Sequence, residues 1–375
     1  MDRMRRRSLG VAIALASLWL AGPAAAQFTP FEAAIAEFDA ELASGVAKTA
    51  DGCYSIAVFI GNEVVWSKGY GWADIENAIA CTEATIGRTG SISKSFTAVA
   101  MMQLVERGII GLDDPVADYF PEIENLAEPP EGMRPITFRM LASHTAGLHR
   151  EPNLEGAASG SIYKWEENIL ESIPATHFKT PPGTEYSYSN IGFGILGLAS
   201  SRSAGVPFMT LVEDQIFKPL GMTSSAFTIN TPELAARLSV GYERDDQTGE
   251  LSSEQATLEH FGRGYKVPNG GIYSTVGDLA KFATAMMGES PVEILSEESR
   301  TEMLTPQPPA EGYGLGFQLG VEQGMRMAGH GGSVAGYNAG LVFDLESKIG
   351  IAILRTTSYN PSVLGLLEKL AAARR

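Results

Sequence analysis

The sequence predicts an α+β fold, in which an antiparallel sheet flanked by helices carries an inserted mainly helical domain. Strand-like runs lie near both ends of the chain, within residues 54–70 and 313–354. Between them, residues 116–264 contain Pro-punctuated loops and short helical stretches with little two-residue alternation. The sequence contains no internal repeat and no low-complexity linker, so two independent domains in tandem are not expected. We therefore predict a sheet domain of residues 27–115 and 265–375 and a mainly helical domain of residues 116–264.

The first predicted elements are a helix and a hairpin. Apolar side chains recur at helical spacing through residues 30–44, and Gly45 is expected to end this helix. Residues 54–60 and 63–70 are typical of β-strands, and the Gly-Asn pair between them is typical of a two-residue hairpin turn. Two paired strands are therefore expected at the start of the sheet.

A long buried helix is predicted over residues 91–107, because apolar residues recur there every three or four positions until Gly108. The C-terminal part is expected to contain a helix capped by Thr275 and Asp278, three adjacent antiparallel strands and a final helix that starts at a Pro. These elements are predicted at residues 275–287, 313–321, 340–343, 349–354 and 361–373.

Residues 1–26 have the pattern of a secretory signal peptide. Four Arg are followed by an apolar run over residues 10–21, and three Ala stand before Gln27. We therefore expect cleavage after Ala26, a periplasmic or secreted protein, and no membrane span in the mature chain.

Composition narrows the classes of partner. With 44% hydrophobic and 19% charged residues the chain is typical of a globular protein, and its formal net charge is −16. Removing residues 1–26, which hold four Arg and one Asp, changes this charge to −19. Such an acidic chain repels phosphate backbones, so we expect no nucleic-acid partner. Five scattered His without metal-ligand spacing predict no metal site. In an oxidising compartment, Cys53 and Cys81 could form a disulfide, or remain as two free thiols.

Ser91 is the strongest candidate nucleophile. A serine hydroxyl needs a base for its proton and oriented donors for the oxyanion that it creates. Lys94 follows one helical turn later on the same face, and the start of the predicted helix offers free backbone N–H groups. A second S-x-x-K, Ser161 to Lys164, lies in a predicted loop of small residues. On the pattern alone, Ser91 could also be a helix N-cap.

Two further motifs carry groups that suit acyl transfer. Tyr188 and Asn190 form the single Y-x-N of the chain, and a tyrosine near cations can exchange the serine proton or protonate a leaving group. His330 precedes two glycines that allow a substrate to approach the backbone. Taken alone, this glycine-rich segment is more typical of a turn between strands. No chemical role follows for His144, for which we predict a structural hydrogen bond.

These motifs, in this order, resemble the serine β-lactamase and penicillin-binding protein superfamily, and in particular its class C branch. Five segments carry the resemblance, at residues 90–116, 136–148, 181–197, 268–282 and 328–340. It implies a β-lactamase/transpeptidase-like fold and a serine hydrolase that needs no cofactor. It also implies site roles. Ser91 would be the acylated nucleophile, Lys94 its proton-exchanging neighbour, Tyr188 the general base and acid, Asn190 a substrate-positioning residue, and the N–H groups of Ser91 and Ser333 the oxyanion hole.

The chain departs from that family where class C β-lactamases carry Lys-Thr-Gly, because His330, Gly331 and Gly332 stand there. With a reference pKa near 6.5, His330 is expected to be charged only part of the time at neutral pH. Arg355 could replace the missing cation, although an edge arginine in solvent is the interpretation that the sequence favours.

We therefore expect a hydrolase acting on small esters or D-amino-acid-containing peptides, with at most weak β-lactamase activity. The alternative function is a non-catalytic sensor of peptidoglycan peptides or β-lactams. The sequence leaves open the natural substrate and the oligomeric state.

Overall fold

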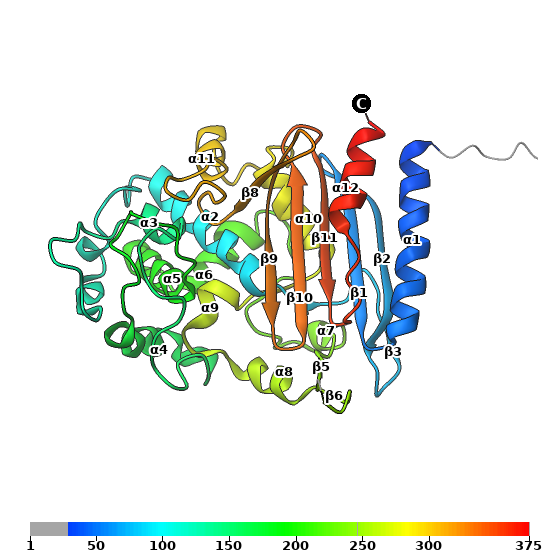
Figure 1. The fold of residues 1–375 in the computed structure, drawn as a ribbon, viewed down its shortest axis with the longest axis horizontal. Coiled ribbons are helices and arrows are strands. Elements are labelled where there is room, and N and C mark those ends of the chain that lie inside the picture. The colour runs from blue at the N-terminus through cyan, green and yellow to red at the C-terminus, as the bar shows by residue number, and fades with distance from the viewer. Residues whose placement is uncertain (1–28, 246, 375) are drawn as a thin grey trace, which may run out of the picture.

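The computed structural model describes residues 29–245 and 247–374, so the predicted signal peptide lies outside the described residues. Its centre is a seven-stranded sheet of order β3-β2-β1-β11-β10-β9-β8, with every neighbouring pair antiparallel (Figure 1). Because β1 pairs with β11, the sheet joins segments from the two ends of the described chain. The strands are β1 (Cys53–Ile60), β2 (Glu63–Asp74), β3 (Ile79–Ala80), β8 (Gln318–Glu322), β9 (Met325–Val334), β10 (Tyr337–Asp344) and β11 (Ile349–Arg355).

Two helices cover one face of the sheet, which we call the outer face: α1 (Pro30–Thr49) and α12 (Val363–Ala372) (Figure 1). Their apolar sides join the outward side chains of the sheet in one buried cluster. The cluster includes Phe38, Leu42, Ile56, Val58, Ile351 and Leu367. In Figure 1 these helices stand beside β2 and β11, while β9 and β8 lie at the opposite edge of the sheet.

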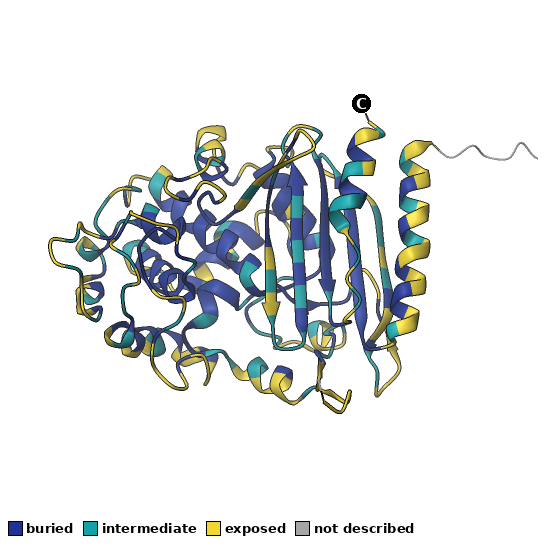
Figure 2. Ribbon diagram, viewed as in Figure 1, coloured by how far each residue is buried: buried dark blue, intermediate teal, exposed yellow. Residues whose placement is uncertain are grey.

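The opposite face packs on α2 (Ser93–Glu106) and α10 (Val276–Met286), which lie in the largest hydrophobic core. Phe96 of α2 stacks on Phe282 of α10, with ring centroids 3.8 Å apart. The N-cap predicted for the second helix is confirmed, since Thr275 Oγ1 accepts a hydrogen bond from the Asp278 N–H at 3.3 Å. Figure 2 shows α2 in the interior, with buried residues along most of its length.

Three of the remaining helices, α5, α6 and α9, pack against α2 on the side away from the sheet (Figure 1). The central one is α5, which is buried and contacts α2, α3 and α9. In the described ranges no single helix has the length and hydropathy to cross a bilayer. The required length and hydropathy are met only by α5 and the segment Phe208–Phe217 taken together, and these two are bent by 81° relative to each other. The helices are α3 (Phe138–Ala142), α4 (Trp165–Ser172), α5 (Asn190–Ala204), α6 (Phe208–Val212), α7 (Pro232–Ala235), α8 (Glu254–Leu258), α9 (Val267–Gly270) and α11 (Glu297–Met303). Two short strand pairs complete the fold: β4 (Gly87–Arg88) with β7 (Tyr273–Ser274), and β5 (Glu243–Arg244) with β6 (Leu251–Ser252).

Two predicted element boundaries are wrong. The first helix continues past Gly45 to Thr49, and Gly45 is a packing glycine, because a Cβ on it would lie 2.1 Å from the Tyr359 ring. The strand predicted at 313–321 is limited to Gln318–Glu322, since the residues before it form turns.

The composition of the glycine-rich segment at 328–340 suggested a turn between strands. In the structure most of this segment is strand. Residues through Val334 belong to β9, and β10 begins at Tyr337, so the turn between them is only two residues long. The glycines hide the two-residue alternation from which a strand is predicted, while the ladder with β10 supplies the hydrogen bonds that hold the segment extended.

Cys53 and Cys81 form a disulfide, which resolves the alternative left open by the sequence. The bond ties the start of β1 to the segment after β3, and it closes a loop with a sequence separation of 28 residues. A cross-link that closes a loop of this length stabilises a fold by about 3.6 kcal/mol in the chain-entropy account.

Candidate active site

Ser91 lies in a single 3₁₀ turn, Gly90–Ile92, that leads into α2. Strand β9 passes close beside this turn because glycines face each other across the contact. A Cβ on Gly332 would lie 2.0 Å from the Thr89 carbonyl oxygen, and a Cβ on Gly90 would lie 2.7 Å from the Ser333 nitrogen. Gly90 also has φ +51°, a conformation that favours glycine. Both glycines are thus required for the approach of β9 to Ser91.

The two N–H groups expected to form the oxyanion hole, those of Ser91 and Ser333, lie on backbone segments in close contact, since a Cβ on Gly332 would lie 3.1 Å from the Ser91 nitrogen. In an extended strand the N–H groups of alternate residues point to the same edge, and the Gly331 N–H donates to Gln318 Oε1 at 3.3 Å, on the edge away from β10. The Ser333 N–H therefore points to that open edge as well. The Ser91 N–H is in the first turn of the helical segment, where backbone donors lack intrahelical partners. Together they can stabilise a developing oxyanion.

Lys94 contacts the candidate nucleophile from inside the protein. Its side chain is fully buried, and Nζ lies 3.0 Å from Ser91 Oγ and 3.2 Å from the Asn269 carbonyl oxygen, to which it donates. Burial lowers the pKa of Lys94 well below 10.5, and the positive charge of Arg150 lowers it further. Burial thus favours the neutral form of this amine more than water does, and a neutral amine can take the serine proton.

Tyr188 faces Ser91 and Lys94, with its ring centroid 4.8 Å from Lys94 Nζ. Burial raises the pKa of Tyr188 to about 12, although a hydrogen bond with Ser91 and the charge of Arg150 favour the phenolate. The Arg150 guanidinium carbon lies 5.0 Å from the ring centroid. At neutral pH Tyr188 is therefore a phenol that can donate a proton to a leaving group, and its expected role as general base stays a prediction.

The side chain and carbonyl oxygen of Asn190 make hydrogen bonds with Glu151 and Asn269, and not with Ser91, Lys94 or Tyr188. Its Nδ2 donates to Glu151 Oε1 at 2.6 Å, and its carbonyl oxygen accepts a hydrogen bond from Asn269 Nδ2 at 2.6 Å. Lys266 also contacts Glu151, with Nζ 3.3 Å from Oε1. The structure thus ties Asn190 to the helical part of the protein, and its predicted contact with substrate stays a prediction.

His330 is neutral, which corrects the expectation that it is charged part of the time at neutral pH. Its Nδ1–H donates to the Gly331 carbonyl oxygen at 2.6 Å, so Nε2 accepts a hydrogen bond from the Tyr313 hydroxyl at 3.0 Å. Burial is the main cause that lowers the pKa of His330 to about 3, with a smaller contribution from positive charge on Lys94 when that amine is protonated. His330 therefore positions β9 and supplies no charge for a substrate.

Two aromatic residues that the sequence did not assign to the site complete its interior. His144 Nδ1 accepts a hydrogen bond from the Ser189 N–H at 3.0 Å, and its ring lies 4.1 Å from the Tyr188 ring, which confirms the structural role predicted for His144. Tyr313, whose hydroxyl holds His330, carries no motif that could have identified it.

We expect the free energy of unfolding to fall as the pH drops from about 6.5 towards 4. Burial lowers the pKa of His330 to about 3, that of His260 to about 4, and that of His144 well below 6.5. Below pH 6.5 the unfolded state therefore binds protons that the folded state does not. Each such histidine contributes a slope of up to about 1.4 kcal/mol per pH unit. Urea unfolding at pH 7.5, 6 and 5 measures this slope of the unfolding free energy against pH. The variant His330→Gln should have a smaller slope. A free energy independent of pH over this range would contradict the assignment.

Ser91 opens into a cavity of about 500 Å³ whose wall includes two arginines. Arg150 lies beside Tyr188, and Arg355 lies at the end of β11 with Nη1 donating to the Thr357 carbonyl oxygen at 2.6 Å. The structure thus places the half-buried Arg355 on the cavity wall and not in open solvent. Arg150 is a cation that the sequence did not single out. Among the described residues no three His, Cys, Asp or Glu side chains converge as metal ligands.

Comparison with known proteins gives a consistent result. A family model described as "Beta-lactamase" matches residues 31–374. Curated relatives include "Beta-lactamase-like protein 4" of Dictyostelium discoideum, 29% identical over 80% of this chain and 56% of that protein. They also include "D-alanyl-D-alanine-carboxypeptidase/endopeptidase AmpH" of Escherichia coli K12, 29% identical over 68% of this chain and 62% of that protein. The chain thus spans less than two thirds of the length of either relative.

Solved structures show the same fold. A structure titled as the octameric penicillin-binding protein homologue from Pyrococcus abyssi superposes with a TM-score of 0.73 at 28% identity, covering 89% of this chain and 76% of that one. A class C β-lactamase superposes with a TM-score of 0.75 at 19% identity, covering 92% and 97%. The β-lactamase and penicillin-binding protein fold predicted from the sequence is therefore confirmed.

Proposed function

Since the chain belongs to the β-lactamase family, we propose that it is a serine hydrolase that forms an acyl-enzyme on Ser91. The observation that carries this proposal is the position of the buried Lys94 amine, 3.0 Å from Ser91 Oγ. Its proximity supplies the base that a serine hydroxyl needs, and the N–H groups of Ser91 and Ser333 supply the donors for the oxyanion.

The proposed reaction has two halves. Ser91 Oγ attacks the carbonyl carbon of an ester or amide while its proton moves to the neutral Lys94 amine, and the carbonyl oxygen becomes negative between the two N–H groups. The Tyr188 phenol then protonates the leaving atom, and Lys94 returns a proton to Tyr188. In the second half a water molecule attacks the acyl-enzyme through the same proton path and releases the acid. This chemistry uses no cofactor.

We further propose that the substrates are small esters or D-amino-acid-containing peptides. The D-alanyl-D-alanine carboxypeptidase named among the relatives supports the peptide class. The neutral His330 argues against efficient β-lactam hydrolysis, because a permanent cation is missing at the position where class C β-lactamases carry one.

Arg355 is expected to bind a substrate carboxylate in place of that cation. A charged hydrogen bond is worth about 1.5–3 kcal/mol, so Arg355→Ala should raise KM for carboxylate-bearing substrates about 10- to 100-fold and leave that for neutral esters nearly unchanged. Arg326→Ala, which removes an exposed arginine of β9, is the matched control. Steady-state kinetics on a peptide ending in D-alanine and on its amide measure the effect. Unchanged kinetics on every carboxylate substrate would exclude this role.

The proposed function is tested with a substrate panel on purified protein: p-nitrophenyl acetate, a peptide ending in D-Ala-D-Ala, and benzylpenicillin. Turnover of the ester or the peptide is the expected result. A long-lived penicillin adduct without turnover of any of the three would favour the non-catalytic sensor instead. Folded protein that neither turns over a substrate nor forms an adduct would overturn the proposal.

A further inference from the structure

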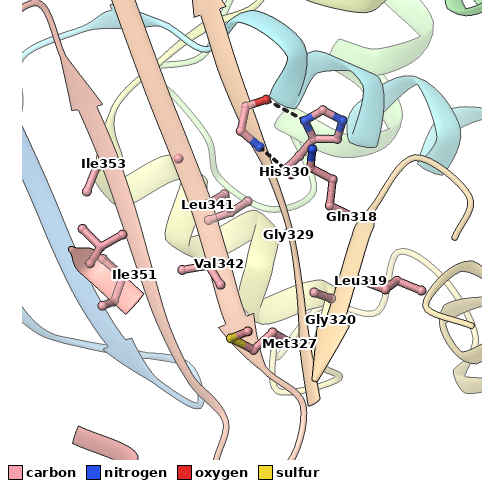
Figure 3. Close-up of a pocket in the computed structure, with 14 residues that line it drawn as sticks. Gln318, Leu319, Gly320, Met327, Gly329, His330, Leu341, Val342, Ile351 and Ile353 are labelled. Atoms are coloured by element: carbon pink, nitrogen blue, oxygen red, sulfur yellow. Dashed lines mark hydrogen bonds between the residues drawn. The ribbon is translucent and has the colours of Figure 1, made fainter. Parts of the chain in front are cut away.

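A second cavity, of about 310 Å³, adjoins the one that contains Ser91. It lies over β9, β10 and β11, and Figure 3 shows its residues spread from Ile351 and Ile353 across Val342 to Met327 and Gly320. Both cavities are lined by Gln318, Gly331 and Ile353. The two cavities therefore adjoin along these shared residues.

The second cavity is apolar, whereas the first contains both arginines and Ser91. Its walls carry few polar groups, and its floor includes Gly340, which exposes no side chain. We call it the apolar groove and define it by the following residues. They are Leu319, Met327, Gly340, Val342, Ile353 and Val363. Val363 belongs to α12, so this terminal helix forms one side of the apolar groove.

Gly331 connects the catalytic cavity to the apolar groove. No atom lies within 4 Å of the position that its Cβ would occupy, and its φ is not in the left-handed region, so the space is open only because the side chain is missing. Gly331 pairs with Gly340 in the register of β9 and β10, which extends the open floor by one strand.

The chemistry of acylation determines which part of a substrate faces this opening. The carbonyl is held at Ser91 and Ser333, while the leaving atom must face the hydroxyl of Tyr188. Tyr188 and Gly331 line the same cavity as Ser91. A leaving group that faces Tyr188 therefore lies in the cavity into which Gly331 opens, on the side of the apolar groove.

We propose that the substrate has an apolar chain on its leaving group, and that this alcohol or amine chain lies in the apolar groove. The inference rests on the proposed function and narrows its substrate class. Apolar walls favour a hydrocarbon because each methylene removed from water adds to binding, and the volume is in the usual range for ligand pockets, about 300–1,000 Å³.

Hexyl acetate and ethyl acetate test the proposal, because they differ only in the leaving alcohol. We expect kcat/KM, followed by acid release, to be at least about tenfold higher for hexyl acetate. In p-nitrophenyl hexanoate and p-nitrophenyl acetate the chain is on the acyl side. We therefore expect no such increase in kcat/KM from the acetate to the hexanoate.

Two variants locate the effect. Val342→Asp places a charge in the apolar groove, and Gly331→Val fills the opening with a side chain for which the Cβ position is free. Each variant should reduce the ratio of kcat/KM for hexyl acetate to kcat/KM for ethyl acetate about tenfold or to unity. Val64→Asp, on the exposed part of β2, is the matched control and should leave the ratio unchanged. Thermal unfolding checks that each variant is folded. If Val342→Asp does not fold, Gly331→Val alone provides the test.

The outcomes separate this inference from the proposed function. Absence of any Ser91-dependent ester turnover would defeat the proposed function, and the groove assignment with it. Turnover without a preference for hexyl acetate, a preference that survives both variants, or a gain confined to the acyl series would overturn the groove assignment alone.

Discussion

Ser91→Ala is expected to lower kcat/KM for ester and peptide substrates by about 10⁴-fold or more and to abolish every covalent adduct. The variant removes the Ser91 hydroxyl, which has Lys94 Nζ 3.0 Å away and lies beside the backbone of Ser333. Alanine has no atom that could attack a carbonyl, so only binding and oxyanion contacts would remain. Initial rates with p-nitrophenyl acetate on protein of known concentration measure this loss.

The second S-x-x-K motif provides the control. Ser161 caps a short helical turn, its Oγ accepting a hydrogen bond from the Tyr163 N–H at 3.3 Å, and the Lys164 side chain is 68% exposed. Ser161→Ala should therefore keep wild-type rates. If Ser91→Ala retained substantial activity while Ser161→Ala lost it, the nucleophile would be misassigned.

Tyr188→Phe should lower kcat/KM by about 10²- to 10⁴-fold, the usual contribution of a positioned general acid or base. Phenylalanine keeps the ring contact with His144 but removes the hydroxyl that reaches Ser91. The loss should be larger for substrates with poor leaving groups, such as peptides, than for p-nitrophenyl esters, because the nitrophenolate leaves without protonation.

Tyr186→Phe is the matched control for this variant. The Tyr186 side chain is half-exposed, and its ring packs near His144 and Tyr313 at centroid distances of 5.9 and 5.8 Å. Its rates should match the wild type. Equal losses in the two variants would point to altered packing around His144 and would contradict a proton-transfer role for Tyr188.

Much of the fold could be predicted from local patterns. The hairpin of β1 and β2, the helix after Ser91 and the cap at Thr275 are all encoded within a few neighbouring residues, and the structure contains each of them. A sheet assembled from both ends of the chain followed from the distribution of strand-like runs. Local reasoning failed at Gly45 and in the glycine-rich β9, because in both places a distant segment decides what the glycine does.

The candidate site divides in the same way. Lys94 could be placed beside Ser91 because one helical turn separates them. Arg150 and Tyr313 reach the site through tertiary packing from segments far along the chain, and neither carries a local pattern. The charge of His330 could not be inferred from its reference pKa, because burial in the folded protein lowers that pKa to about 3.

The central claim is that Ser91 becomes acylated, and intact-mass analysis followed by peptide mapping tests it most directly. Purified protein is mixed with a fluorescent penicillin and quenched at short times. We predict a mass increase equal to one whole penicillin, because ring opening by Ser91 adds the molecule without loss of atoms, and a label on the peptide that contains Ser91. A label on any other residue, or ester turnover that persists unchanged in Ser91→Ala, would contradict the account.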